Sequence, residues 1–291
     1  MHPAPSVIIF TSLSGLGFGL FAWLGLGIPD VYGWSSFAVF FIAYALSVGG
    51  LLASVFHLAN KKNVIYSFSQ WRTSWLSREG VMAVITLLTF APFAIGRIFL
   101  GIDLAIFGYV GSILALITVF VTSMIYTQLK AVPRWNMPLT PVLFLLYAVS
   151  GGALMTGEQR VAGFLIAILT LVQIAAWVLG DARFTGSGTD KGSATGLGGL
   201  GKVRVFESAH TSRNYILDEM VHVIGRRHAT KLRTIAALTI GLFPVVLLLM
   251  LPVGHVTSLT ALASHIVGVF ISRWLFFAEA EHVVGLYYSR G

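Results

Sequence analysis

Cysteine is absent from this chain of 291 residues. Without thiolates the chain can form no disulfide and can ligate neither an iron–sulfur cluster nor a cysteine-bound metal. Any metal that carries electrons must therefore be held by histidine or by a partner protein.

Charged residues are also scarce. They make up 10% of the chain, whereas 56% is hydrophobic and the mean hydropathy is +0.85. Apolar runs of about 20 residues are what a helix needs to cross a hydrocarbon core of about 30 Å. The opening MHPAPSVIIFTSLSG has no basic stretch and no small-residue cleavage site, so we interpret it as the start of a first span rather than a signal peptide. The composition indicates a multi-pass membrane protein.

Eight apolar runs are long enough to be transmembrane helices. Lipid cannot satisfy backbone hydrogen bonds, so only helices or closed barrels cross it, and these runs are too long and too uniform for barrel strands. We predict an all-α, polytopic bundle of eight transmembrane helices forming one membrane domain over 1–291, with a Gly-rich and amphipathic cytoplasmic loop at 181–232. A kink is expected at Pro92, and the last run should continue as a helical extension. The expected spans are 5–27, 36–60, 79–101, 104–129, 138–156, 160–180, 233–253 and 258–287.

Basic residues collect on one side of this predicted bundle. With eight spans, the connections after the second, fourth and sixth helices share a side with both termini, and only Arg97, Arg160 and Arg273 of the 19 basic residues lie elsewhere. The positive-inside rule then places both termini in the cytoplasm of a bacterial inner membrane. Topology and anionic lipid also explain the net charge of +8 without nucleic acid as a partner.

Two titratable residues bracket the polar stretch between the second and third predicted helices. His57 lies near the end of one helix and Glu79 in the first turn of the next, with Trp71 and Trp75 between them. Singly, each has a structural explanation: an interfacial histidine beside lysines, and a helix-dipole acid after an N-cap at Ser77. Together at one membrane face they favour a pocket for a redox molecule that takes up and releases protons.

The last predicted helix carries a second polar group of residues. Arg273 lies deep in the span and needs a partner or a water-filled cavity, and Glu279 could pair with it. Two histidines at similar depth could instead ligate haem, and His57 with His265 or His282 is conceivable. Haem-binding bundles usually show several inward histidines at mid-membrane depth, so haem is not expected.

The sequence gives less support to phosphate binding, metal binding or transport. The stretch GLGGLGK at 196–202 resembles a phosphate loop, but Val203 replaces the required Ser or Thr and no strand precedes it. The histidines of the following segment, at 210, 222 and 228, lack a convergent acidic or thiol partner, so no metal site is predicted. A transporter using Arg273, Glu279 and His282 would be favoured by inverted repeats, and the sequence shows none.

Five blocks of sequence then carry a family resemblance: HPAPSVIIFTSLSGLGFG, FHLAN, FSQWRTSWLSRE, EMVHVIGRRHATKLR and RWLFFAEAEHV. In these blocks, their order and the number of spans, the chain resembles the membrane anchor subunits of DMSO reductase-type molybdenum oxidoreductases over nearly its whole length. The resemblance implies an anchor that holds a ferredoxin-like iron–sulfur subunit, which carries a catalytic subunit with a molybdenum bis-pterin cofactor. It also implies electron exchange with membrane quinone, without haem.

Site residues follow from the same resemblance. The histidine of the family's FHL motif maps onto His57 and the glutamate of its LS-x-E motif onto Glu79. His57 would hydrogen-bond a quinone oxygen and Glu79 would relay protons, with Trp71, Trp75, Arg273 and Glu279 as further candidates for the quinone pocket. Cytoplasmic catalytic subunits are expected for the related quinone-dependent sulfite dehydrogenase, so the loop charges favour sulfite oxidation. The alternative is a quinol-oxidising anchor of a DMSO reductase-like enzyme.

Overall fold

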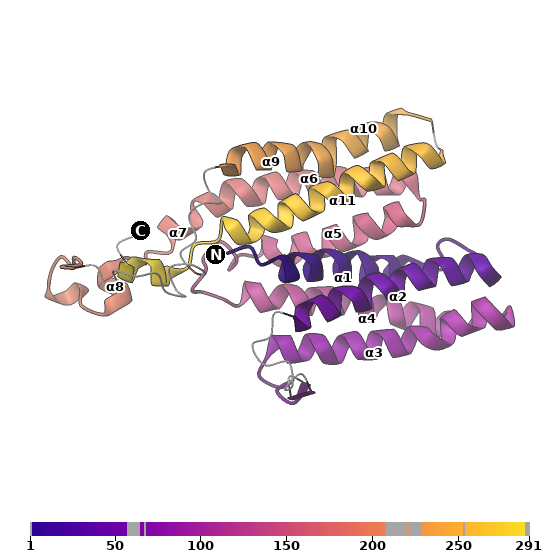
Figure 1. The fold of residues 1–291 in the computed structure, drawn as a ribbon, viewed down its shortest axis with the longest axis horizontal. Coiled ribbons are helices and arrows are strands. Elements are labelled where there is room, and N and C mark those ends of the chain that lie inside the picture. Colours follow the sequence, from indigo (N-terminus) through magenta and orange to yellow (C-terminus); the bar gives the residue numbers. More distant parts are fainter. Residues whose placement is uncertain are drawn as a thin grey trace.

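The computed structural model describes residues 2–56, 65–66, 68–207, 220, 228–252 and 254–288, and within these ranges all regular structure is helical. Seven helical segments are long and apolar enough to span a membrane, and the shorter apolar helix α5 completes a bundle of eight. The elongated bundle is shown in Figure 1, where the connections at one end gather beside both termini. The spanning segments are α1 (Pro5–Leu24), α2 (Gly33–Val55), α3 (Trp75–Ile95) with the π-helical η2 (Gly96–Leu100), α4 (Ala105–Thr127), α5 (Leu139–Met155), α6 (Gln159–Asp181), α9 (Ala229–Ala237) continuing through the π-helical η6 (Leu238–Leu242) into α10 (Phe243–Met250), and α11 (His255–Ala278).

Short helices follow α6 and α11 at the end of the bundle that holds the termini. These are α7 (Arg183–Gly186), α8 (Lys191–Thr195), η3 (Gly198–Leu200) and η7 (Val283–Tyr288). The N–H of Val283 donates to the carbonyl of Ala131 at 2.9 Å, which ties the C-terminal segment to the α4–α5 connection. The prediction that the last span runs on as one helix was therefore wrong, because α11 ends at Ala278 and the chain continues into the separate 3-10 helix η7, which packs beside α8 (Figure 1).

The start of α3 also differs from the prediction. Ser74, not Ser77, is the N-cap, and its hydroxyl accepts from the Ser77 N–H at 3.4 Å. The helix begins at Trp75, so Glu79 lies in its second turn rather than its first. A carboxylate there is too far along the helix to cap free N–H groups, which removes the structural explanation that the sequence offered for it.

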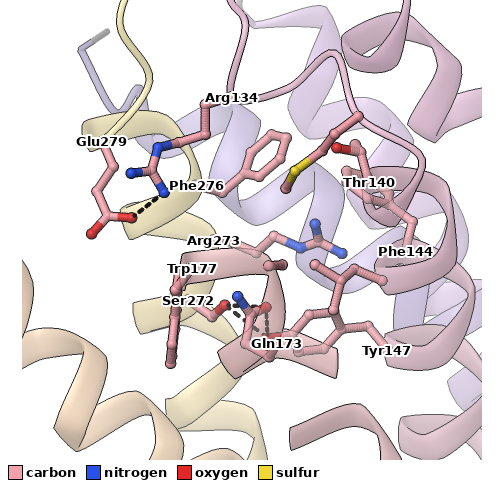
Figure 2. Close-up of a pocket in the computed structure, with 13 residues that line it drawn as sticks. Arg134, Thr140, Phe144, Tyr147, Gln173, Trp177, Ser272, Arg273, Phe276 and Glu279 are labelled. Atoms are coloured by element: carbon pink, nitrogen blue, oxygen red, sulfur yellow. Dashed lines mark hydrogen bonds and ion pairs between the residues drawn. The ribbon is translucent and has the colours of Figure 1, made fainter. Parts of the chain in front are cut away.

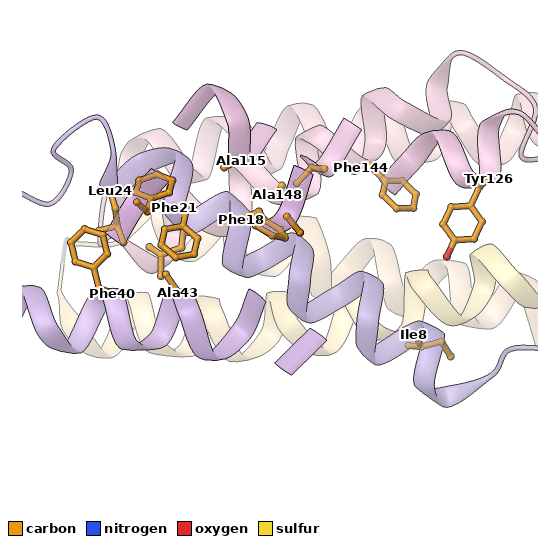
Figure 3. Packing of buried hydrophobic residues seen from close by; sticks show 14 of the residues in the cluster. Ile8, Phe18, Phe21, Leu24, Phe40, Ala43, Ala115, Tyr126, Phe144 and Ala148 are labelled. Atoms are coloured by element: carbon orange, nitrogen blue, oxygen red, sulfur yellow. The ribbon is translucent and has the colours of Figure 1, made fainter. Parts of the chain in front are cut away.

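Helix α1 is the centre of the first half of the bundle and packs along α2, α4 and α5. Its aromatic residue Phe21 stacks on Phe90 at a ring-centroid distance of 4.5 Å and meets Tyr44 edge-on at 4.8 Å. Figure 3 shows Phe21 and Leu24 of α1 facing Phe40 and Ala43 of α2, and Phe18 lying beside Ala148 of α5. These contacts help to bury α1: 72% of an 18-residue apolar stretch of α1 is buried, against 22% of the corresponding stretch of α2.

The second half of the bundle depends on an irregularity at Pro244. Proline has no N–H, so it cannot donate to the Ile240 carbonyl as the fourth residue along a regular helix would. The π-helical turn η6 lies at this point, and α11 supplies the missing donors. Ser264 Oγ donates to the Thr239 carbonyl at 2.9 Å, and His265 Nδ1 donates to the Ile240 carbonyl at 3.1 Å.

The arginines at the opposite end of the bundle have local partners, which for Arg97 are two carboxylates. Arg97 pairs with Asp30 at 3.0 Å and with Asp103 at 2.9 Å, and Arg160 Nη1 donates to the carbonyl of Leu248 at 3.1 Å. This end therefore carries no surplus of positive charge among its described loops. The two ends of the bundle therefore differ in net charge by more than their numbers of lysines and arginines alone indicate.

Candidate functional site

A large cavity lies among α1, α2, α3 and α4, at the end of the bundle that holds the termini. Its volume is about 570 Å³. Most of its wall is apolar, and the polar or titratable residues in the wall are His2, Ser54, Glu79, Tyr126 and Trp135. The apolar part of the lining comprises Ala4, Val7, Phe10, Val48, Leu51, Leu52, Val55, Phe68, Leu76, Gly80, Ala83, Val84, Leu87, Ile125, Leu129, Met220 and Phe277.

The cavity exists because α2 and α3 diverge. Each packs along a different neighbour, α2 on α1 and α3 on α4, and the two helices meet only over a short stretch. Tyr44 Oη donates to the Leu87 carbonyl at 2.9 Å and ties them together below the cavity. From Leu76 to Leu87 the wall of α3 extends about 16 Å, at a rise of about 1.5 Å per residue.

The wall reaches the outer apolar surface of the bundle. Leu52 of α2 is 57% exposed and Val84 of α3 is 46% exposed, yet both also line the cavity. A lipid-soluble molecule could therefore enter between these two helices from the hydrocarbon layer. This geometry matches a ligand with a polar head and an apolar tail better than a water-soluble metabolite.

Glu79 is the charged residue in this wall. Its side chain is 3% exposed, and Thr122 Oγ1 of α4 donates a hydrogen bond to its Oε1. Among the described residues no basic side chain forms an ion pair with it. Because a buried, unpaired carboxylate is costly in a membrane protein, it is retained where it has a function.

The two tryptophans lie beside the cavity rather than in its wall. Arg78 organises them: its Nε donates to the Trp71 carbonyl at 2.9 Å, and its guanidinium lies 4.3 Å from the Trp75 ring centre. Trp71 is 53% exposed. The structure thus gives both residues a place in the interfacial turn before α3, and it does not bring them into contact with the cavity that Glu79 lines.

Phe68 and Tyr126 are among the wall residues that the sequence analysis did not single out. Phe68 lies within the FSQW block and packs over Gly80, where an added Cβ would come within 2.9 Å of its ring. Tyr126 of α4 lines the cavity, and its hydroxyl makes no hydrogen bond among the described residues, so it can serve the ligand. Neither stood out in the sequence, because an aromatic residue in an apolar helix is normally part of the core.

His57 lies outside the described residues. The described part of α2 ends close to it in the chain: the helix ends at Val55, and Ser54 and Val55 both line the cavity. His57 follows two residues after the last lining residue of α2. Its predicted role stays a prediction.

Arg273 and Glu279 line a different cavity, of about 30 Å³, between α5, α6 and α11 (Figure 2). They are not among the residues that line the cavity of Glu79, and their predicted part in quinone binding stays a prediction. The structural alternative, an ion pair between them, is not formed, because Glu279 accepts from Arg233 Nε at 2.7 Å and from Arg134 Nη1 at 3.3 Å. The spacing of six residues along α11 turns the two side chains to different neighbours.

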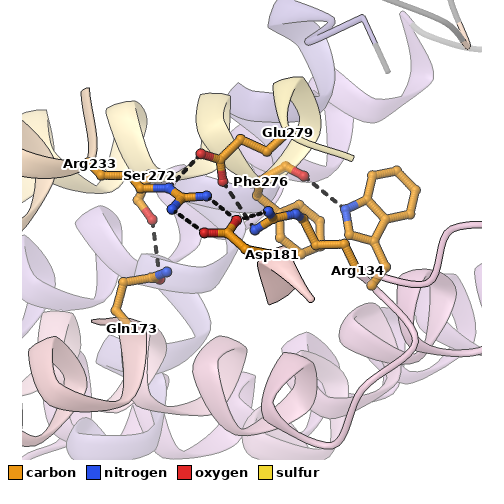
Figure 4. A network of polar contacts seen from close by, with 8 residues as sticks. Arg134, Gln173, Asp181, Arg233, Ser272, Phe276 and Glu279 are labelled. Atoms are coloured by element: carbon orange, nitrogen blue, oxygen red, sulfur yellow. Dashed lines mark hydrogen bonds and ion pairs between the residues drawn. The ribbon is translucent and has the colours of Figure 1, made fainter. Parts of the chain in front are cut away.

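Glu279 belongs to a network of two carboxylates and two guanidinium groups, drawn in Figure 4. Arg233 also donates from Nη1 and Nη2 to the two carboxylate oxygens of Asp181, at 2.7 and 2.6 Å. Arg134 pairs with Asp181 as well. The network joins α6, α9, α11 and the α4–α5 connection, so its first role is to hold the second half of the bundle together.

The remaining histidines of the described residues have local partners or lie at the surface. His265 is fully buried, and its hydrogen bond to the Ile240 carbonyl gives it a structural role. His282 lies beyond α11, where its Nδ1 accepts from the Val284 N–H at 3.0 Å and burial lowers the pKa of its imidazole. In the described part of the chain no group of three or more acidic or histidine side chains could hold a metal ion.

Comparison with known proteins agrees with this arrangement. Residues 1–278 match the family described as DMSO reductase anchor subunit (DmsC). The chain belongs to this family. This anchor is also 30% identical, in an alignment of 326 positions that covers 99% of both chains, to a protein from Allochromatium vinosum that is named as a subunit of sulfite dehydrogenase. No solved structure shows a significant match to it. The anchor is therefore the multi-pass membrane subunit of an oxidoreductase complex.

Proposed function

We propose that the α1–α4 cavity binds membrane quinone and that the anchor passes electrons from its partner subunits to that quinone. The observation that carries the proposal is the position of Glu79 at the polar part of a cavity of about 570 Å³ whose wall is otherwise mostly apolar. A quinone has the matching character, since its oxygens need polar partners and its isoprenoid tail needs an apolar path. The exposed flanks of α2 and α3 supply that path.

Reduction of a quinone consumes two electrons and two protons, and the residues of the cavity provide for the protons. In this proposal Glu79 takes a proton from water at the membrane face and delivers it toward a quinone oxygen, while Thr122 fixes the orientation of its carboxyl group. Tyr126 offers a hydroxyl donor to the same headgroup. His57, two residues after the last lining residue of α2, is proposed as the partner of a quinone oxygen.

The partner subunits are proposed to be a ferredoxin-like iron–sulfur subunit and a catalytic subunit with a molybdenum bis-pterin cofactor. A chain without cysteine cannot hold iron–sulfur clusters, so the electrons must arrive from outside it. The proposed substrate is sulfite, supported by the name of the relative and by the basic face that holds both termini. Oxidation of sulfite with water to sulfate releases two electrons, which is the number that one quinone takes up.

The second candidate is an anchor that works in reverse, oxidising quinol for a DMSO reductase-like enzyme. The description of the matching family favours it. Both candidates use the same cavity, but they differ in the side of the membrane on which the catalytic subunits are expected. Sidedness is therefore the property that separates them.

A variant of His57 tests the quinone assignment. In the His57→Leu complex we expect quinone-dependent turnover to fall at least ~100-fold, because a proton and hydrogen-bond partner of the quinone is lost. Turnover with an artificial dye, which takes electrons from the partner subunits, should stay at the wild-type rate. The matched control is His255→Leu, since His255 is exposed at the start of α11. Unchanged quinone turnover in His57→Leu would rule out its role at the site.

Reporter fusions test the sidedness. A green fluorescent protein fused after Gly291 should fluoresce, and alkaline phosphatase at the same position should be inactive, because the basic loops place the C-terminus in the cytoplasm. Fusions within the α1–α2 connection, at the opposite end of the bundle, provide the converse control. An active phosphatase at the C-terminus would remove the reason for preferring sulfite and favour the second candidate.

A further inference from the structure

Arg273 is a buried cation with no acidic partner among the described residues. Its side chain is 4% exposed and lies in the membrane-spanning helix α11. Two aromatic rings contact its guanidinium, Phe144 at 3.8 Å and Tyr147 at 4.9 Å from the ring centres. Its Nε makes no hydrogen bond in the described structure. Aromatic faces attract a cation but do not cancel its charge, so a full positive charge remains inside the bundle.

The guanidinium of Arg273 faces the cavity of about 30 Å³ between α5, α6 and α11, as Figure 2 shows. A cavity needs about 10–15 Å³ to hold one water molecule, so this one has room for one or two species of that size. A quinone headgroup, a carboxylate ligand or a tetrahedral oxyanion would need more space. Only a small occupant fits.

Two groups beside this cavity have hydrogen-bond donors without a partner among the described residues. The hydroxyl groups of Tyr147 and Ser272 lie 2.7 Å apart, and each also lies within hydrogen-bond distance of Gln173 Oε1, at 2.9 and 3.3 Å. These contacts occupy the amide oxygen and leave the amide Nε2 of Gln173 without a hydrogen bond among the described residues. The donors left without a partner in the described structure are those of the Arg273 guanidinium and the amide nitrogen of Gln173.

The charges near Arg273 also favour a negatively charged ligand. The nearby acids are Asp181 and Glu279, and both are already bound by Arg134 and Arg233. Two carboxylates against these two guanidinium groups make the network neutral. Arg273 is the additional cation, and nothing in the network compensates it.

We propose that this cavity is a binding site for a small monovalent anion of the size of chloride. The anion accepts from Arg273 and from the Gln173 amide, neutralises the buried guanidinium and bridges α6 to α11. Water would fill the space, but it would leave the charge uncompensated and would need an acceptor for its own protons. The site is separate from the quinone cavity and does not rest on the proposed electron transfer.

Bromide replacement tests the site in the wild-type complex. The assembled complex would be crystallised with sodium bromide as the halide, and anomalous diffraction would be recorded at the bromine edge. We expect a bromide peak in the cavity beside Arg273 and Gln173. A well-ordered cavity that contains only water, with no anomalous peak, would overturn the proposal.

Chloride binding to the detergent-solubilised complex gives an independent measurement. Equilibrium dialysis with radioactive chloride should show one ion per complex fewer in Arg273→Met than in the wild type, whereas Arg273→Lys should keep the ion. Arg160→Met is the matched control, because that arginine donates to helix-end carbonyls at the opposite membrane face. Equal chloride content in the wild type and in Arg273→Met would contradict the assignment. If Arg273→Met fails to assemble, the lysine variant and the bromide map still decide it.

Discussion

Glu79→Gln should reduce quinone-dependent turnover of the assembled complex by at least ~100-fold, the range that loss of a positioned acid or base produces. The substitution keeps the shape of the side chain and can keep the hydrogen bond from Thr122 Oγ1 to the remaining carbonyl oxygen. It removes the ability to take up and release a proton. Steady-state assays with a water-soluble quinone analogue and with a dye, on the same membranes, separate this loss from a defect in assembly.

Three variants act as controls for this experiment. Glu158→Gln changes an exposed carboxylate at the opposite end of the bundle and should leave both activities unchanged. Thr122→Val removes the hydroxyl that orients Glu79 and should cause a smaller loss than Glu79→Gln. Glu79→Asp keeps the proton but shortens the side chain, so partial activity is expected. Wild-type quinone turnover in Glu79→Gln would show that protons reach the site by another route.

The eight spans could be predicted from the sequence because hydrophobic length is a local property. Their ends were less predictable. Residues 283–288 are apolar enough to belong to the last helix, and only the bond from Val283 to the Ala131 carbonyl shows that the chain turns away. Likewise, Thr73, Ser74 and Ser77 all precede Glu79, and the sequence does not show which of them caps α3.

The site could be predicted only in part for a similar reason. Glu79 stands out in the sequence because a carboxylate in an apolar run is costly. Tyr126 does not stand out in the sequence. It lines the cavity only because α2 and α3, which are distant from it in the chain, diverge and leave that space open. Arg273 and Glu279 are neighbours on one helix, yet they bind different groups, because Asp181 and two arginines from other segments determine where Glu279 binds.

Gly19→Val should have the largest effect on assembly. Helices α1 and α5 cross with backbone against backbone at this point: a Cβ on Gly19 would overlap the Ala148 carbonyl, and a Cβ on Gly152 would overlap the Gly19 carbonyl. Small residues at such a crossing, here Gly19 on α1 against Ala148 and Gly152 on α5, are typical of close helix pairs in membranes. Overpacking of side chains costs about 1–3 kcal/mol, and here the backbone itself would have to move.

The expected result of Gly19→Val is loss of the folded anchor from the membrane, measured by immunoblotting of membrane and soluble fractions. Dye-linked activity should then move from the membrane pellet to the supernatant, because the partner subunits lose their attachment. Glu79→Gln should not cause this shift, which distinguishes a failed bundle from a failed quinone site. Gly15→Val is the matched control one turn earlier on α1, since nothing lies within 4 Å of an added Cβ there. If both glycine variants assemble equally well, α1 and α5 do not approach as closely as the structure places them.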